Sequence, residues 1–205
     1  MHFSRIAVFA SGQGSNFAAL LEAQREGLLG DGKIELLVSD KPEAPVAQRA
    51  VDAGIPTLLL RPKDFASREH YEAEIVAELQ RREIGLVVLA GYMRLITPVL
   101  LAPYAGRIVN IHPSLLPAFA GKDVIQQALD YGVKLTGVTV HFVDGGMDTG
   151  PVIAQRSVAV LDNDTEDSLA ERIHKVEHEL YPEVVGALAS GKVKLSGRKT
   201  IIREK

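Results

Sequence analysis

The sequence predicts an α/β fold in which a single doubly wound, mostly parallel sheet carries an antiparallel addition in its C-terminal half. Two observations predict it. In the first half, short and nearly continuous apolar runs alternate with amphipathic stretches, which is typical of parallel strands covered by helices on both faces. In the second half, two segments alternate strictly between apolar and polar residues, which favours antiparallel strands.

The expected elements follow this rhythm along the chain. We expect strands at about 5–10, 34–39, 57–60, 86–90 and 107–111, followed by the alternating pair at 135–143 and 152–160. Helical patterns fall at 16–27, 44–53, 68–82, 97–103, 122–131 and 164–189. We expect Asp164 to cap the last helix at its N-terminus, and Pro182 to kink that helix or divide it in two.

Composition narrows the class of protein. The 205 residues contain no cysteine, which excludes disulfides, thiolate metal sites and a cysteine nucleophile. The net charge of -3 gives no sign of a protein that binds nucleic acid or a membrane surface. No apolar run approaches the roughly 20 residues that span a bilayer, and no basic segment precedes a long apolar one, so we expect a cytoplasmic location. One domain covering residues 1–205 is expected.

The stretch FASGQGSNFAALL, residues 9–21, is a glycine-rich turn between the first strand and the first helix. Gly12 and Gly14 allow close approach of the backbone, and Ser15 and Asn16 add polar side chains. The dinucleotide fingerprint requires a small residue where this chain has Phe17, and no P-loop lysine follows. A tight turn with a helix cap explains part of the pattern. The two glycines and two polar residues favour a site for a single phosphate.

The stretch NIHPSLLP, residues 110–117, places an amide and an imidazole at the end of an apolar strand. Asn110 and His112 should share one face of that strand, at the edge where open α/β sheets bind ligands. Asp148 lies in VDGGMDTGP, residues 143–151, whose glycines permit a loop that brings its carboxylate to His112. An imidazolium held by a carboxylate beside an amide can stabilise an oxyanion. Either residue alone would be interpreted as a cap or a packed ring.

No serine stands in a nucleophile elbow, so covalent acyl transfer is not favoured. Direct attack by a bound amine or water on an activated acyl group fits better. Thr139 and His141 share a face of the next strand, and both either line the cleft or are simply packed. The segment GYMRLI, residues 91–96, is either a turn with a hydrophobic anchor or a pocket wall for a flat heterocycle.

The segment HKVEH, residues 174–178, matches the H-x-x-E-H zinc-helix pattern letter for letter. Only three positions are fixed, and a further ligand would have to come from elsewhere. The surrounding helix is rich in charge, so a solvated helix face explains most of the pattern. We therefore expect no metal.

With these motifs in place, the sequence resembles the family of phosphoribosylglycinamide formyltransferases, the folate-dependent glycinamide ribonucleotide transformylases of purine synthesis. The resemblance covers nearly the whole chain. It rests on SGQGSN, LAGYMRLI, NIHPSLLP, TGVTVHFVDGGMDTGPVI and EHELYP. NIHPSLLP with the downstream HFV and aspartate is shared by the wider formyltransferase superfamily, whereas the first turn is more particular to the glycinamide ribonucleotide enzymes. The family usually has proline where this chain has Ala120.

The resemblance implies a Rossmann-like formyltransferase fold. Its half at about 1–105 binds the nucleotide, and its half at about 106–205 carries catalysis and helps bind folate. It implies a catalytic trio of Asn110, His112 and Asp148, nucleotide contacts at Gly14, Ser15, Asn16 and Glu177, and folate-binding positions at Arg68, Met93, Arg94, Leu95, Ile96, Asn110 and Asp144.

The resemblance also implies the reaction. The amine of glycinamide ribonucleotide attacks the formyl carbon of 10-formyltetrahydrofolate, Asn110 and protonated His112 stabilise the oxyanion, and Asp148 holds His112 charged and oriented. The proton leaves through His112 or through water bound to Asp148. The expected partners are this nucleotide and a reduced folate, with neither nucleic acid nor membrane, in a monomer or a homodimer.

Three alternatives stay open at this point. Methionyl-tRNA formyltransferase and formyltetrahydrofolate deformylase share the trio, but each is expected to need a further domain. A nucleotide-binding sensor would explain the first turn and would leave the trio without a role.

Overall fold

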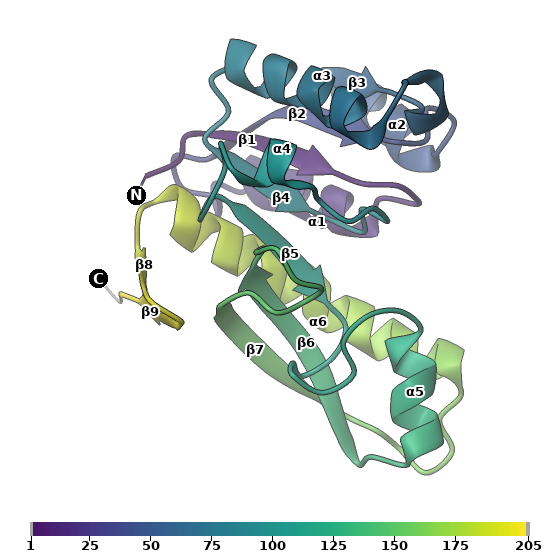
Figure 1. Cartoon of the computed structure of the whole chain (residues 1–205). Helices are drawn as coiled ribbons and strands as arrows, with labels where there is room; N and C mark the ends of the chain where they lie inside the picture. Colours follow the sequence, from purple (N-terminus) through teal and green to yellow (C-terminus); the bar gives the residue numbers. More distant parts are fainter. Residues whose placement is uncertain (1, 204–205) are drawn as a thin grey trace.

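A computed structural model describes residues 2–203 of the chain (Figure 1). The strands are β1 (Arg5–Phe9), β2 (Lys33–Ser39), β3 (Thr57–Leu59), β4 (Leu86–Leu89), β5 (Ile108–His112), β6 (Leu135–Phe142), β7 (Val152–Ala159), β8 (Val193–Ser196) and β9 (Lys199–Ile202). The helices are α1 (Ser15–Arg25), α2 (Pro45–Asp52), α3 (Arg68–Arg81), α4 (Pro98–Leu101), α5 (Val124–Tyr131) and α6 (Glu166–Ala189), with one 3-10 turn at Pro62–Asp64.

Seven strands form one sheet in the order β3-β2-β1-β4-β5-β6-β7. The pairings from β3 to β5 are parallel, whereas β6 pairs antiparallel with both β5 and β7. This arrangement confirms the predicted doubly wound sheet with an antiparallel addition. Because β1, β4 and β5 are neighbours, the loops after their carboxyl ends emerge side by side at one edge of the sheet.

Helices cover both faces of the parallel part, as the apolar strands predict. Along β1, Ile6 and Val8 point into a core shared with α1, α2 and α6, while Ala7 and Phe9 point into a second core shared with α3 and α4. Figure 1 shows α6 as one long helix that extends from beside α1 to α5 and so connects the parallel strands with the antiparallel ones. The sheet therefore holds the strand ends and the loops that carry the functional groups in fixed positions.

Of the two outcomes expected at Pro182, a kink or a division of the helix, the division is wrong, because α6 is continuous from Glu166 to Ala189. The hydroxyl of the adjacent Tyr181 donates to the carbonyls of Leu89 and Val109, at 2.6 and 3.2 Å. This buried anchoring compensates for the hydrogen bond that proline cannot make.

The helix cap also differs from the expectation. Thr165, and not Asp164, is the N-cap, and its side chain and that of Ser168 form a reciprocal capping box. The Asp164 carboxylate instead forms an ion pair with Arg172, which lies farther along the same helix.

The C-terminal hairpin of β8 and β9 was not expected from the sequence. Its two strands pair through a tight turn at Gly197 and Arg198, and Gly197 has a φ of 59° that suits glycine. Within residues 2–203, no helix is both long and apolar enough to cross a bilayer.

Candidate active site

The end of β5 and the facing part of β6 carry four polar side chains on one face of the sheet. Asn110 lies directly across from His141, and His112 lies across from Thr139, in the antiparallel register of β5 and β6. Residues opposite one another in such a pair share a face. The structure therefore brings Asn110 and His112 to the same side, as the strand alternation predicts.

Asp148 reaches this group from the loop between β6 and β7. Its Oδ2 lies 3.5 Å from His112 Nδ1, and its Oδ1 lies 3.7 Å from His141 Nε2. Asp148 itself has a φ of 55°, and the neighbouring Gly150 lies so close to the Phe142 carbonyl that no side chain fits there. The glycines thus permit the loop path that brings the Asp148 carboxylate to His112, as expected from the sequence.

The surroundings of Asp148 keep its carboxylate charged. Burial alone raises the pKa of Asp148, but the His141 ring, the Gly121 N–H and the charge of His112 outweigh that effect and lower the pKa below its ordinary value. The Gly121 N–H donates to Oδ2 at 2.9 Å. A charged Asp148 can orient His112 and balance a positive charge on it.

The other nitrogen of His112 has its own acceptor. His112 Nε2 donates to the Phe119 carbonyl at 2.8 Å. Both ring nitrogens of this buried side chain therefore face oxygen atoms, the Phe119 carbonyl at hydrogen-bond distance and Asp148 Oδ2 at 3.5 Å. Phe119 has a φ of 51°, so the loop presents its carbonyl through an uncommon backbone conformation.

His141 lies between the Asn110 amide and the Asp148 carboxylate. His141 Nδ1 donates to the Phe142 carbonyl at 2.8 Å. Its Nε2 lies 3.3 Å from Asn110 Nδ2 and 3.7 Å from Asp148 Oδ1. The His141 ring therefore contacts both side chains and helps to fix their positions.

Thr139 belongs to the scaffold and does not line the cleft. It is fully buried, and its Oγ1 donates to the Ser114 carbonyl at 2.7 Å while accepting from the Leu116 N–H at 3.1 Å. Gln155 Nε2 donates to the same oxygen at 3.0 Å. Thr139 therefore fixes the chain that follows His112.

The glycine-rich turn (residues 11–16) is the second part of the site. Gly14 is the N-cap of α1 with a φ of 75°, and no side chain caps the helix. A Cβ at Gly14 would lie 2.5 Å from a methyl of Val46, so the turn and α2 approach too closely for any other residue. The free N–H groups at the start of α1 suit an anion, as the sequence predicts.

Glu177 of α6 lies against this turn. Asn16 Nδ2 donates to Glu177 Oε2 at 3.1 Å. Burial raises the pKa of Glu177, although the Asn16 hydrogen bond and the charge of His174 act in the opposite direction. Asn16 Oδ1 is buried and has no hydrogen-bond partner within residues 2–203. That oxygen is free to accept from a ligand hydroxyl or amine.

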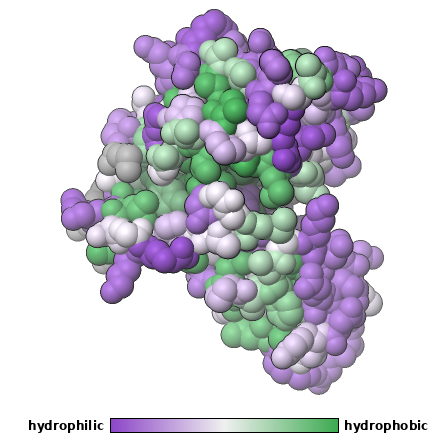
Figure 2. Space-filling model, in the orientation of Figure 1, coloured by the Kyte–Doolittle hydropathy of each residue, from purple (hydrophilic) through white to green (hydrophobic). Residues whose placement is uncertain are grey.

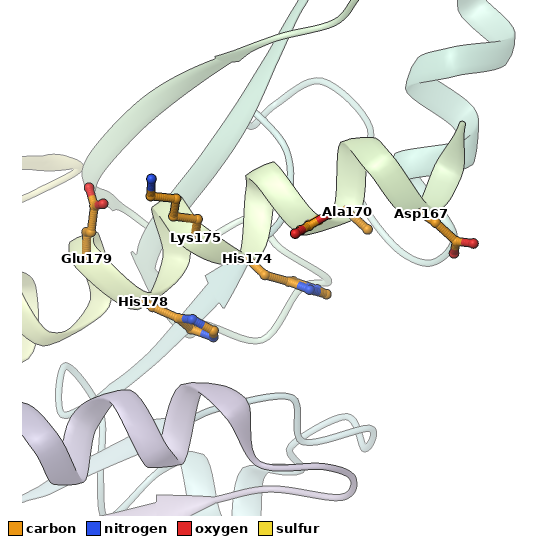
Figure 3. A pocket seen from close by; sticks show the side chains of 7 residues that line it. Asp167, Ala170, His174, Lys175, His178 and Glu179 are labelled. Carbon is orange, nitrogen blue, oxygen red and sulfur yellow. The ribbon is translucent and has the colours of Figure 1, made fainter. Parts of the chain in front are cut away.

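The histidines of HKVEH lie beside Glu177 on α6. Figure 3 shows His174 and His178 projecting from one side of the helix and Lys175 and Glu179 from the other. These residues line an open hollow with a volume of about 630 Å³. The two rings stack with their centroids 6.5 Å apart. Among the described residues, no group of three or more histidine, cysteine or acidic side chains is arranged to hold a metal ion.

The residues that the resemblance assigns to folate lie in two loops and at one helix start. Met93 and Leu95 are 74 % and 52 % exposed in the 91–96 loop, and Arg68 is exposed at the start of α3. Asp144 closes its own loop by accepting from the Gly146 N–H and the Thr149 hydroxyl. Figure 2 shows hydrophobic atoms gathered towards the middle of one face of the molecule, flanked by hydrophilic parts.

Several contacts of the site were not found from the sequence. The Phe119 carbonyl and the Gly121 N–H are backbone groups, so no residue type marks them. Ser11 is the first residue of the quoted SGQGSN motif, but its partner Asp40 stands 29 positions away. Asp40 follows the end of β2, and a polar residue after a buried strand was the available signal.

The family model described as "Formyl transferase" matches residues 4–185. The chain is 48% identical over 184 residues to the phosphoribosylglycinamide formyltransferase of Bacillus subtilis (strain 168), covering 90% of this chain and 94% of that protein.

Solved structures agree with the sequence comparison. Glycinamide ribonucleotide transformylase 1 from Geobacillus kaustophilus is 55% identical with a TM-score of 0.89, over 92% of this chain and 100% of the other. The corresponding transformylase from Symbiobacterium toebii is 42% identical with a TM-score of 0.95, over 99% and 95% of the two chains.

Proposed function

Because the chain belongs to the formyl transferase family, we propose that it transfers the formyl group of 10-formyltetrahydrofolate to the amine of glycinamide ribonucleotide, a step of purine biosynthesis. The observation that carries the proposal is the convergence of Asn110, His112 and Asp148 at the carboxyl end of β5. A site that stabilises an oxyanion beside a phosphate-binding turn suits a formyl donor and a nucleotide acceptor.

The nucleotide binds through the glycine-rich turn. The free N–H groups at the start of α1 hold its phosphate, and Asn16 and Glu177 contact its polar groups. The unpartnered Asn16 Oδ1 supports this assignment, because it offers an acceptor that the protein itself does not use. The pterin of the folate lies against the backbone of the 91–96 loop and the loop that contains Asp144.

The chemical step follows from the side chains. The substrate amine attacks the formyl carbon, a C–N bond forms, and the carbonyl electrons pass to the oxygen. The free N–H of Asn110 donates to that oxyanion, and His112 donates through Nε2 by exchanging the Phe119 carbonyl for it. When the intermediate collapses, the bond to folate N10 breaks and the proton lost by the amine passes to N10.

Asp148 acts on His112 and does not attack the formyl group itself. Its lowered pKa keeps it ionised, so it balances the imidazolium through the 3.5 Å contact. Proton transfer to N10 proceeds through His112 or through water held by Asp148.

A spectrophotometric assay tests the proposed function. Folate deformylation is followed with 10-formyltetrahydrofolate in the presence and in the absence of glycinamide ribonucleotide. Deformylation that requires the nucleotide supports the transferase. Deformylation in water alone identifies a hydrolase that shares the trio, and binding without turnover identifies a nucleotide-binding sensor.

The proposal includes the cytoplasmic location and the monomeric or homodimeric state expected from the sequence. Light scattering at the assay concentration distinguishes the two oligomeric states. Fractionation of the producing cells tests the location, and recovery of the protein in the membrane fraction would contradict it.

A further inference from the structure

A buried carboxylate joins the two loops that the proposed function assigns to different substrates. Asp40 follows β2, and its side chain is 3% exposed. Its Oδ1 accepts from the Ser11 hydroxyl at 2.5 Å, and its Oδ2 accepts from Arg94 Nε at 2.9 Å. Ser11 begins the glycine-rich turn, and Arg94 lies in the 91–96 loop. One carboxylate therefore holds both segments.

Ser11 adds a direct link between the same segments. Its hydroxyl oxygen accepts from the Met93 N–H at 3.0 Å while its proton goes to Asp40. Its own backbone N–H donates to the Gly91 carbonyl at 3.1 Å. The start of the turn thus makes three hydrogen bonds, one to Asp40 and two to the 91–96 loop, and a shift of either segment is transmitted to the other.

The 91–96 loop is also held through its side chains. The Arg94 guanidinium lies 6.0 Å from the centre of the Tyr71 ring, and the Tyr71 hydroxyl meets the Tyr92 hydroxyl at 2.8 Å. Met93 and Leu95 remain largely exposed. Ser11 thus holds the loop backbone and Asp40 holds the Arg94 side chain, and both leave the exposed surface of Met93 and Leu95 available for a ligand.

We propose that Asp40 is a positioning residue that couples the nucleotide site to the folate site. The inference rests on the proposed function for the identity of the two ligands. Each ligand orders the loop that it contacts. Because Asp40 and Ser11 bond the two loops together, ordering one reduces the cost of ordering the other, and each ligand raises the affinity for its companion.

The experiment measures that coupling directly. Tetrahydrofolate is titrated into the protein by calorimetry with and without glycinamide ribonucleotide, a pair that cannot react because no formyl group is present. We expect the nucleotide to lower the Kd of tetrahydrofolate about fivefold or more, the lower end of typical coupling between sites. In Asp40→Asn the ratio of the two Kd values should fall to nearly one, because the NH2 group that replaces one carboxylate oxygen cannot accept the hydrogen bond from Ser11 or Arg94 that this oxygen accepted.

A matched control separates coupling from stability. Asp164 is also a carboxylate with a side chain 3% exposed, and its arginine partner Arg172 is as exposed as Arg94, at 35% and 36%. It lies outside both loops. Asp164→Asn should lower Tm to a similar degree and keep the wild-type Kd ratio, which a purely structural role for Asp40 would not predict.

Ser11→Ala provides a second variant that keeps the carboxylate and removes only the bridging hydroxyl. It should also lower the Kd ratio. A wild-type ratio of one, or an unchanged ratio in both Asp40→Asn and Ser11→Ala, would overturn the coupling. Failure of the wild-type protein to bind either ligand would instead overturn the proposed function, so the two failures are distinguishable.

Discussion

The two parts of the site are built in different ways. The glycine-rich turn offers free backbone N–H groups at the start of one helix, all from one continuous segment of chain. The side-chain cluster (Asn110, His112, His141 and Asp148) draws on two strands and a distant loop, and its hydrogen bonds depend on backbone groups of yet another loop. The turn is therefore suited to bind a fixed charge, and the cluster to stabilise a charge that develops during reaction.

If the turn binds the nucleotide and the cluster carries the chemistry, substitutions in the cluster should lower turnover, and substitutions in the turn should lower nucleotide affinity. His112→Ala should lower kcat by roughly 10²–10⁴-fold, the range for a positioned acid–base group. Calorimetry should find the Kd of glycinamide ribonucleotide nearly unchanged. His70→Ala, which removes an exposed histidine on α3, serves as control and should keep wild-type turnover. Near-normal kcat in His112→Ala contradicts its assignment.

The turn is tested by a pair of glycines with the same backbone conformation. Gly14→Ala should raise the Kd of glycinamide ribonucleotide about tenfold or more, because the added Cβ meets Val46 at 2.5 Å and displaces the turn from its binding geometry. The kcat at saturating nucleotide should change much less.

Gly27 is the matched control for that substitution. It has a φ of 74°, against 75° for Gly14, but a Cβ there meets nothing within 4 Å. Gly27→Ala therefore has the same backbone strain and should keep nucleotide affinity. Equal losses of affinity in the two variants would mean that strain, and not the turn geometry, explains the effect.

Substitution of Thr139 tests whether this residue only supports the side-chain cluster or takes part in the chemistry. Thr139→Val should lower the free energy of unfolding by about 1–3 kcal/mol, because the Ser114 carbonyl and the Leu116 N–H lose a buried partner. Urea denaturation measures this change. Thr139→Ser keeps the hydroxyl and should recover most of the stability. A kcat loss in Thr139→Val as large as that of His112→Ala would place Thr139 in the chemistry.

The smallest expected effect is a change in the pH dependence of stability at Glu177, the α6 residue that accepts from Asn16 of the glycine-rich turn. Burial raises its pKa above the 4.5 of a free glutamate, so the folded chain binds this proton more tightly than the unfolded chain. Its contribution to stability is therefore greatest at low pH and falls as the pH rises through the raised pKa.

Glu177→Gln has no such titration. The Tm of this variant minus that of the wild type should increase as the pH is raised above 4.5. A flat difference for Glu177→Gln would mean that the surroundings of this carboxyl do not raise its pKa.

The difference between the two regions also explains what the sequence could predict. The seven strands of the main sheet and the turn at 11–16 depend on neighbouring residues, so hydrophobic periodicity and glycine spacing indicate them. The expected division of α6 at Pro182 was wrong. Local helix propensity does not include tertiary contacts such as the hydrogen bonds from Tyr181 to the carbonyls of Leu89 and Val109. The hairpin at Gly197 was not predicted, although a short turn with a glycine between two β-prone segments is a known hairpin signal.

The cluster was predictable only in part. Strand alternation places Asn110 and His112 on one face, and glycine content permits the approach of Asp148. The Phe119 carbonyl that His112 meets depends on a left-handed backbone conformation at a phenylalanine, which no residue preference indicates. Asp40 and Ser11 meet through the order of strands in the sheet, which is a property of the whole fold.

We expect a bound amine, and not water, to receive the formyl group in a reaction that depends on His112. NMR of the reaction of formyl-¹³C-labelled 10-formyltetrahydrofolate with glycinamide ribonucleotide, in the wild type and in His112→Ala, tests this expectation. The label should appear as an amide of the nucleotide in the wild type and hardly at all in the variant. Label released as free formate, or equal transfer by both proteins, would contradict it.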